Sequence, residues 1–122
     1  QSPDAVFIPF PDRHIDHRII FDASLVACRP NTQIAPKLVM AYETLSETHW
    51  NAPGIEPAFV PEVFIDITSE FADKKKALSC YESQIKGVGS RSLDAVEALA
   101  KFRGSQNGFL FAEAFKLVRL NV

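Results

Sequence analysis

The chain has 122 residues, of which 47% are hydrophobic and 23% charged, and its formal net charge is −2. This composition is typical of one globular domain and excludes a disordered chain. The charge gives no reason to expect nucleic acid as a partner, and no apolar run approaches the roughly 20 residues of a membrane helix. The N-terminus has no signal-peptide pattern, so we expect a cytoplasmic protein in which the two cysteines, Cys28 and Cys80, are buried free thiols.

The first part of the chain predicts a strand, a helix and a second strand. The apolar run Ala5–Phe10 predicts a buried strand, and Lys37–Tyr42 predicts another. Between them, apolar residues recur at three- and four-residue spacing over His17–Cys28, which predicts a helix. Its end precedes Pro30, because the residue before a proline avoids the helical conformation. Asp16 stands where the helix N-cap belongs.

The second part predicts a long loop, two strands and two helices. The loop is Glu43–Phe59, and the strands are Val63–Ile67 and Ala112–Leu120. The first helix is Ser69–Ile85, which Thr68 or Ser69 caps and Gly87 stops. The second helix is Ser92–Arg103, which Ser90 or Ser92 caps. Strands that alternate with helices indicate an α/β fold. We therefore expect one domain over residues 1–122, a partial Rossmann-like sheet of about four strands flanked by about three helices.

The segment His14-Ile15-Asp16-His17 lies between the first strand and the first helix, where ligands gather in α/β sheets. His17 falls in the first helical turn, where the helix dipole disfavours imidazolium and favours the neutral form that binds metals. Asp16 can accept a hydrogen bond from a ring N–H and so fix the tautomer. These residues can supply one metal ligand and one acid/base imidazole. They cannot supply the three protein ligands of a catalytic zinc.

A simpler interpretation is also open at this point. Asp16 can be only an N-cap and the two histidines only polar loop residues, because H-x-D-H is a short motif. His49, which lies beside Trp50 in the long loop, is expected to be an ordinary surface histidine.

The motifs taken together resemble the C-terminal half of the LmbE-like, PIG-L-type zinc-dependent N-deacetylases. That family has "H-P-D-H" after a strand, then "P-x-V-x-x-D-I-T", a lysine-rich helix ending near "S-Q", "R-G", and "G-x-x-Y-A-E-A-F". The matching positions here, in the same order over nearly the whole chain, are His14-Ile15-Asp16-His17, Asp66-Ile67-Thr68, Ser83-Gln84, Arg103-Gly104, Gly108 and Phe111-Ala112-Glu113-Ala114-Phe115.

This resemblance implies hydrolysis of an N-acyl group, typically the acetyl group of an N-acetylated amino sugar, by a zinc-bound water. His17 resembles the metal-binding histidine of the family. His14 resembles the imidazole that stabilises the oxyanion or protonates the leaving amine. Asp16 resembles the carboxylate that orients that imidazole.

Two departures from the family affect the expected activity. The family's other zinc ligands and its general base lie in an "A-H-P-D-D-E" segment that these 122 residues lack, and Phe111 replaces a common tyrosine whose hydroxyl assists the oxyanion. We therefore expect a fragment or derivative of the deacetylase, inactive alone, with zinc bound weakly or not at all. The alternative is a non-catalytic α/β binding or assembly module.

The expected partner follows from the same departures. Without the family's front half, the strand Ala5–Phe10 would be a bare sheet edge with apolar residues on both faces. A bare edge of this kind pairs readily with another chain. We expect a homo-oligomer, or a partner chain that carries the missing half.

Overall fold

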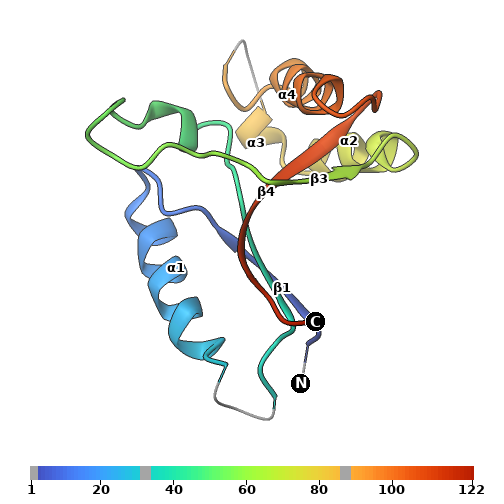
Figure 1. Cartoon of the computed structure of the whole chain (residues 1–122). Helices are drawn as coiled ribbons and strands as arrows, with labels where there is room; N and C mark the ends of the chain where they lie inside the picture. The colour runs from blue at the N-terminus through green and yellow to red at the C-terminus, as the bar shows by residue number, and fades with distance from the viewer. Residues whose placement is uncertain (1–2, 31–33, 86–88) are drawn as a thin grey trace. The chain divides into compact units, whose positions relative to one another are not determined.

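The structure is a computed structural model that describes residues 3–30, 34–85 and 89–122. Figure 1 shows the elements, which confirm the predicted α/β class. In chain order they are β1 (Ala5–Pro9), α1 (Ile15–Ala27), β2 (Leu38–Tyr42), the 3-10 helix η1 (Thr48–Trp50), β3 (Val63–Asp66), α2 (Phe71–Ser79), α3 (Glu82–Ile85), α4 (Leu93–Ser105) and β4 (Ala112–Leu120). No helix in these residues is both long and apolar enough to cross a membrane.

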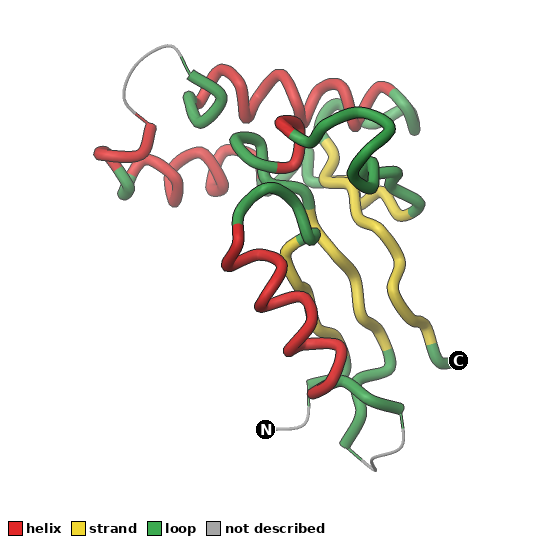
Figure 2. Tube along the Cα trace, turned by 90° about the vertical axis from the view of Figure 1, so that its left-hand side faces the viewer, coloured by secondary structure: helices red, strands yellow, loops and turns green. Residues whose placement is uncertain are grey.

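The four strands form one mixed sheet in the order β1-β2-β4-β3 (strands in Figure 2). β1 and β2 pair in parallel, from Ala5 opposite Leu38 to Pro9 opposite Tyr42. With α1 as the crossover they make a βαβ unit, the connection that parallel neighbours require. β2 pairs with β4 in the antiparallel direction, with a register shift between Val39 and Met40. β1 is therefore an edge strand of the sheet, as the order shows.

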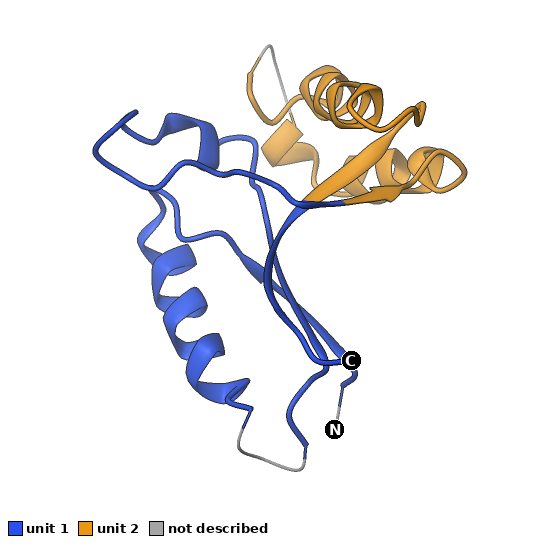
Figure 3. Ribbon diagram, viewed as in Figure 1, with its two compact units in different colours: residues 1–63, 115–122 blue, residues 64–114 orange. Residues whose placement is uncertain are grey.

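The chain divides into two compact units, shown in different colours in Figure 3. Unit 1 comprises residues 1–63 and 115–122, and unit 2 comprises residues 64–114. The organisation of the chain as one domain stays a prediction.

In unit 1, α1 packs on one face of the strands. Its residues Phe21 and Leu25, with Cys28 just after it, belong to a core cluster, in which Cys28 is buried as predicted. The strands contribute Val6, Ile8, Val39, Ala41 and Val118 to this cluster. The outer side of α1 carries exposed apolar side chains, Ile15, Ile19, Ile20 and Val26, and Phe7 on the edge strand is 49% exposed.

The start of α1 differs from the prediction in its cap. The N-cap is His14, whose backbone is extended and whose Nδ1 accepts a hydrogen bond from the Asp16 backbone N–H at 3.2 Å. Asp16 was expected at the cap but lies in the first turn. The imidazole nitrogen of His14 satisfies a free N–H of that turn in place of a carboxylate.

The helix predicted over Ser69–Ile85 is two helices, α2 and α3. Ser79 Oγ donates to the Lys75 carbonyl at 2.8 Å, and side-chain bonds of this kind compete with the helical ladder where α2 ends. Neither Thr68 nor Ser69 is the cap, since the N-cap position is Glu70 and Thr68 bonds to Asp66. The predicted burial of Cys80 is wrong, because Cys80 is exposed at the break between the two helices, as is Tyr81 after it. Gly87, the expected stop, lies outside the described residues.

Unit 2 has its own small core. Ile67, Phe71 and Ala100 are buried, with Val96 and Phe111 packed against them. The Phe71 and Phe111 rings stack with centroids 3.9 Å apart. The cap of α4 is as predicted, because Ser92 accepts from the Ala95 N–H at 3.2 Å. Ala100 and Arg103 of this helix are buried.

Candidate functional site

A buried carboxylate organises the segment between β1 and α1. Asp12 follows shortly after Pro9, the last residue of β1, and its side chain is 0% exposed. Its Oδ1 accepts from the His14 backbone N–H at 3.0 Å and lies 2.8 Å from His17 Nδ1. Its Oδ2 accepts from Thr48 Oγ1 at 2.8 Å. An ionised carboxylate buried in this way is stable because both oxygens are hydrogen-bonded.

The contact with Asp12 sets the tautomer of His17. An ionised carboxylate only accepts, so His17 Nδ1 carries the proton. The neutral ring then has its lone pair on Nε2, which is the arrangement of histidines that ligate metals. The side chain is 20% exposed, so this nitrogen belongs to a partly desolvated imidazole in the first turn of α1. The geometry makes His17 an acceptor, suited to a metal ion or to a proton.

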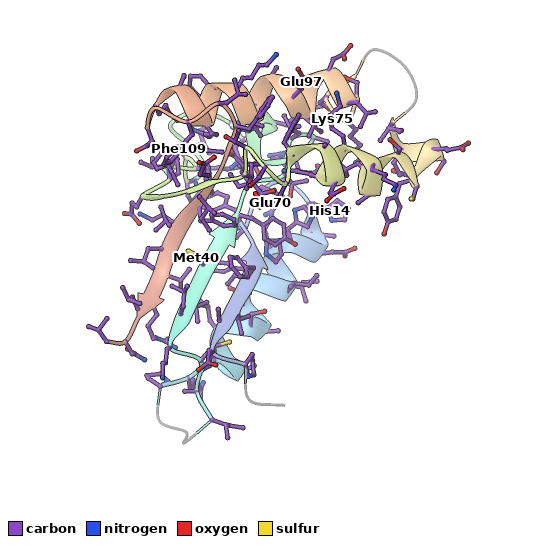
Figure 4. The ribbon with its side chains drawn as sticks, turned by 90° about the vertical axis from the view of Figure 1, so that its right-hand side faces the viewer. His14, Met40, Glu70, Lys75, Glu97 and Phe109 are labelled. Carbon is purple, nitrogen blue, oxygen red and sulfur yellow. The ribbon has the colours of Figure 1, made fainter. Side chains whose placement is uncertain are left out.

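In His14 the donor and acceptor nitrogens are exchanged relative to His17. Its Nδ1 accepts from the Asp16 backbone N–H, so in the neutral ring the proton lies on Nε2. The His14 and His17 rings stack with centroids 4.9 Å apart and planes 28° apart. Figure 4 labels His14 at the start of α1. Two neighbouring imidazoles thus offer one acceptor and one donor, which is what a metal ligand and an oxyanion donor require.

Asp16 contacts His14 mainly through its backbone. Its carboxylate Oδ2 is 3.8 Å from His14 Nδ1, too long for a hydrogen bond, and its side chain is 67% exposed. The orienting role expected of Asp16 stays a prediction. Asp12 is the carboxylate that holds His17, and the sequence reasoning missed it. Its signal was its position as the first charged residue after the apolar run Ala5–Phe10.

Two arginines hold the histidine segment in shape. Arg18 Nε donates to the Asp12 carbonyl at 2.8 Å. Arg13 pairs with Glu56 at 3.1 Å, which joins the segment to the loop after β2. The hydrogen bond from the Ala52 backbone N–H, with a smaller one from Arg13, holds the pKa of Glu56 below its usual value. Glu56 is therefore ionised and available to Arg13 at neutral pH.

The loop that contains η1 has a second carboxylate–imidazole pair. His49 Nε2 lies 3.2 Å from Glu43 Oε2, and the Glu43 side chain is only 6% exposed. His49 itself is exposed, as predicted. It is nevertheless oriented by a buried carboxylate.

A complete metal site is not formed by the described part of the chain. No group of three His, Cys, Asp or Glu side chains converges there. His17 fits one ligand position of a zinc site, and the remaining ligands would have to come from elsewhere. Phe111, which was expected to lack the hydroxyl of a tyrosine near the oxyanion, lies in unit 2 with its ring stacked on Phe71.

Comparisons with known proteins bear on the fold alone. No family model matches the chain, and no curated protein matches it. The chain is similar to the crystal structure of the conserved protein TT1542 from Thermus thermophilus, with a TM-score of 0.74 and 22% sequence identity. The match covers 99% of this chain and 54% of that protein, so the chain spans about half of its length. This likeness supports the α/β fold.

Proposed function

We propose that this chain carries the histidine part of a zinc-dependent N-deacetylase site for N-acetylated amino sugars, and that it is inactive by itself. The observation that supports the proposal is a pair of stacked imidazoles that offer different nitrogens. Buried Asp12 holds Nδ1 of His17, which leaves Nε2 as an acceptor, and a backbone N–H holds Nδ1 of His14, which leaves Nε2–H as a donor. A carboxylate that holds one ring N–H is the usual partner of a histidine that ligates a metal, and the one that holds His17 is fully buried.

The roles follow from the hydrogen-bonded nitrogens. His17 Nε2 is the ligand atom, and Asp12 fixes its tautomer. His14 Nε2–H donates to the oxygen of the acyl group as negative charge develops there. Zinc, when bound, supplies the Lewis acid that activates water in this class of reaction. The further ligands and the general base would come from the segment that the family carries upstream, which the 122 residues lack.

Zinc titration tests the assignment of His17. We expect weak binding that does not survive dialysis, since a site with two or fewer protein ligands is not retained. NMR of the ring protons should show that the binding is lost in His17→Ala and kept in the matched variant His49→Ala. One tightly held zinc per chain, with every ligand from this chain, would contradict the proposal.

A deacetylation assay tests the expected inactivity. The purified chain should release no acetate from N-acetylglucosamine, because a positioned base is absent. Turnover that disappears in His17→Ala would show that this chain is a complete enzyme. Sequencing the source DNA upstream adds a positive test, because an in-frame "A-H-P-D-D-E" segment would support the deacetylase.

The second candidate is a non-catalytic module that assembles with copies of itself. It is favoured by the edge position of β1, the 49% exposure of Phe7 on that strand, and the exposed Ile15 and Ile19 on α1. A second copy could continue the sheet at β1 and cover these apolar side chains. Light scattering at micromolar concentration should give a dimer or larger species. A monomer would contradict this candidate, unless a chain with the missing half is its partner.

A further inference from the structure

The loop between β2 and β3 holds a large aromatic side chain in solvent. Trp50, the last residue of η1, is 67% exposed, and Ile55 further along is 86% exposed. Long loops in compact domains are uncommon and are usually functional. An indole kept exposed in such a loop is a candidate contact for a ligand, since tryptophan combines a large apolar face with a polar N–H.

Two contacts fasten this loop to the histidine segment. Thr48 Oγ1 donates to Asp12 Oδ2 in a buried contact, and Glu56 pairs with Arg13. Asp12 and Arg13 directly precede His14 in the chain. Trp50 follows Thr48 by two residues, so these bonds tie the turn that carries it to the histidine segment. Figure 1 shows the loop, in green, at the end of α1 where the helix begins.

The loop is also bonded internally on both sides of the indole. Thr48 Oγ1 accepts from the Thr44 N–H at 2.8 Å, before Trp50. After it, Asn51 Nδ2 donates to the Pro57 carbonyl at 3.1 Å and Glu56 accepts from the Ala52 N–H at 2.9 Å. A loop held in this way loses little freedom when a ligand binds, which favours recognition.

His49, the residue before Trp50, has a polar ring whose orientation is fixed by a carboxylate. Its Nε2 faces buried Glu43 Oε2 at 3.2 Å, so in the neutral ring the lone pair lies on Nδ1. The His49 side chain is 42% exposed. The turn therefore carries an exposed indole and, on the preceding residue, an oriented hydrogen-bond acceptor.

We propose that Trp50 and His49 form a saccharide subsite for the amino-sugar substrate. The indole would lie against the apolar face of a pyranose ring, and His49 Nδ1 would accept from a ring hydroxyl. A sugar ring suits this turn because it has a flat C–H face bordered by hydroxyl groups. Binding sites of this kind combine aromatic surface with a few placed polar groups. The inference rests on the proposed function, which supplies the class of ligand.

The single tryptophan of the chain makes the test direct, because all indole fluorescence comes from Trp50. Titration of the 122-residue chain with N,N′-diacetylchitobiose should change this emission in a saturable way. Binding is measured independently by broadening of the acetyl methyl signals of the sugar in NMR. Trp50→Ala should weaken binding about tenfold, the scale expected when a central tryptophan contact is truncated, and Trp50→Phe should restore part of it.

Ile55→Ala is the matched control, since it removes a more exposed apolar side chain from the same loop and should leave binding unchanged. Equal binding by the wild-type chain and by Trp50→Ala would overturn the subsite and leave the proposed function standing. Absence of saccharide binding to the wild-type chain would also overturn it. The proposed function is judged separately by zinc binding that depends on His17, a measurement in which Trp50 has no part.

Discussion

A carboxylate in unit 1 and one in unit 2 differ in how far they are buried. In unit 1, Asp12 is fully buried and hydrogen-bonded to His14, His17 and Thr48. In unit 2, Glu97 on α4 is 28% exposed and pairs with Lys75 and Lys101, each at 2.8 Å (Lys75 and Glu97 in Figure 4).

The difference in burial between Asp12 and Glu97 distinguishes a structured site from a solvent-exposed surface. A buried charge must have its partners, so its contacts are obligatory and orient the groups around it. Partly exposed ion pairs are screened by water and salt and contribute little. We expect the loss of its lysines to cost Glu97 little stability, whereas the loss of its donors would cost Asp12 much more.

The largest effect is expected for Asp12→Ala. This change leaves the Thr48 hydroxyl, the His14 N–H and the His17 Nδ1–H without their acceptor. We expect a loss of about 3 kcal/mol in the free energy of unfolding, measured by urea denaturation. Asp16→Ala is the control, and it should cost less than about 1 kcal/mol because that side chain lies in solvent in the first helical turn. Equal losses for the two variants would contradict the central place of Asp12.

Gly104→Ala should have the second largest effect, in unit 2. A Cβ at this position would lie 2.6 Å from the Phe109 carbonyl oxygen and 3.1 Å from the Leu110 carbonyl carbon, both backbone atoms. Relief requires a backbone shift, and we expect a cost of about 2 kcal/mol in the free energy of unfolding. Gly89→Ala is the matched control, since a Cβ there has nothing within 4 Å. A neutral Gly104→Ala would show that the loop after α4 adapts freely.

Thr48→Val tests the buried hydrogen bonds of Asp12 with a substitution that nearly preserves the shape of the side chain. It removes the donor to Asp12 and the acceptor of the Thr44 N–H, both in a buried position. We expect a cost of about 1 kcal/mol. Thr68→Val in unit 2 is the counterpart, because Thr68 Oγ1 also donates to an aspartate, Asp66, but in solvent. A larger effect at Thr68 than at Thr48 would break the contrast.

The smallest effect is expected for the ion pairs of Glu97. Hydrogen bonds from Lys101 and Lys75 lower the pKa of Glu97 to about 2, from an ordinary 4.5. A lowered carboxyl pKa means that the pairs stabilise the fold above about pH 4.5 and that this contribution disappears as the pH falls toward 2. NMR titration of the side-chain carboxyl group measures the pKa directly. Glu97→Gln should shift the denaturation midpoint less than Thr48→Val does, and the shift should vanish in high salt.

Periodicity and local chemistry in the sequence determined most of the fold. The strands Lys37–Tyr42 and Ala112–Leu120 and the Ser92 cap were predictable because their signals lie within a few neighbouring residues. The histidine segment was recognisable for the same reason. The break in the helix at Cys80 was not, because it arises from side-chain bonds that compete with an otherwise helical pattern.

The tertiary structure alone decided which aspartate serves His17. Asp12 and Asp16 both lie close to His17 in the sequence, and local spacing does not distinguish them. Asp12 can be buried because Thr48, 36 residues away, donates to Oδ2, the oxygen that neither histidine contacts. The exposure of Trp50 was decided in the same way, by long-range contacts that fasten its loop. Burial depends on which distant segments meet, and no local pattern carries that information.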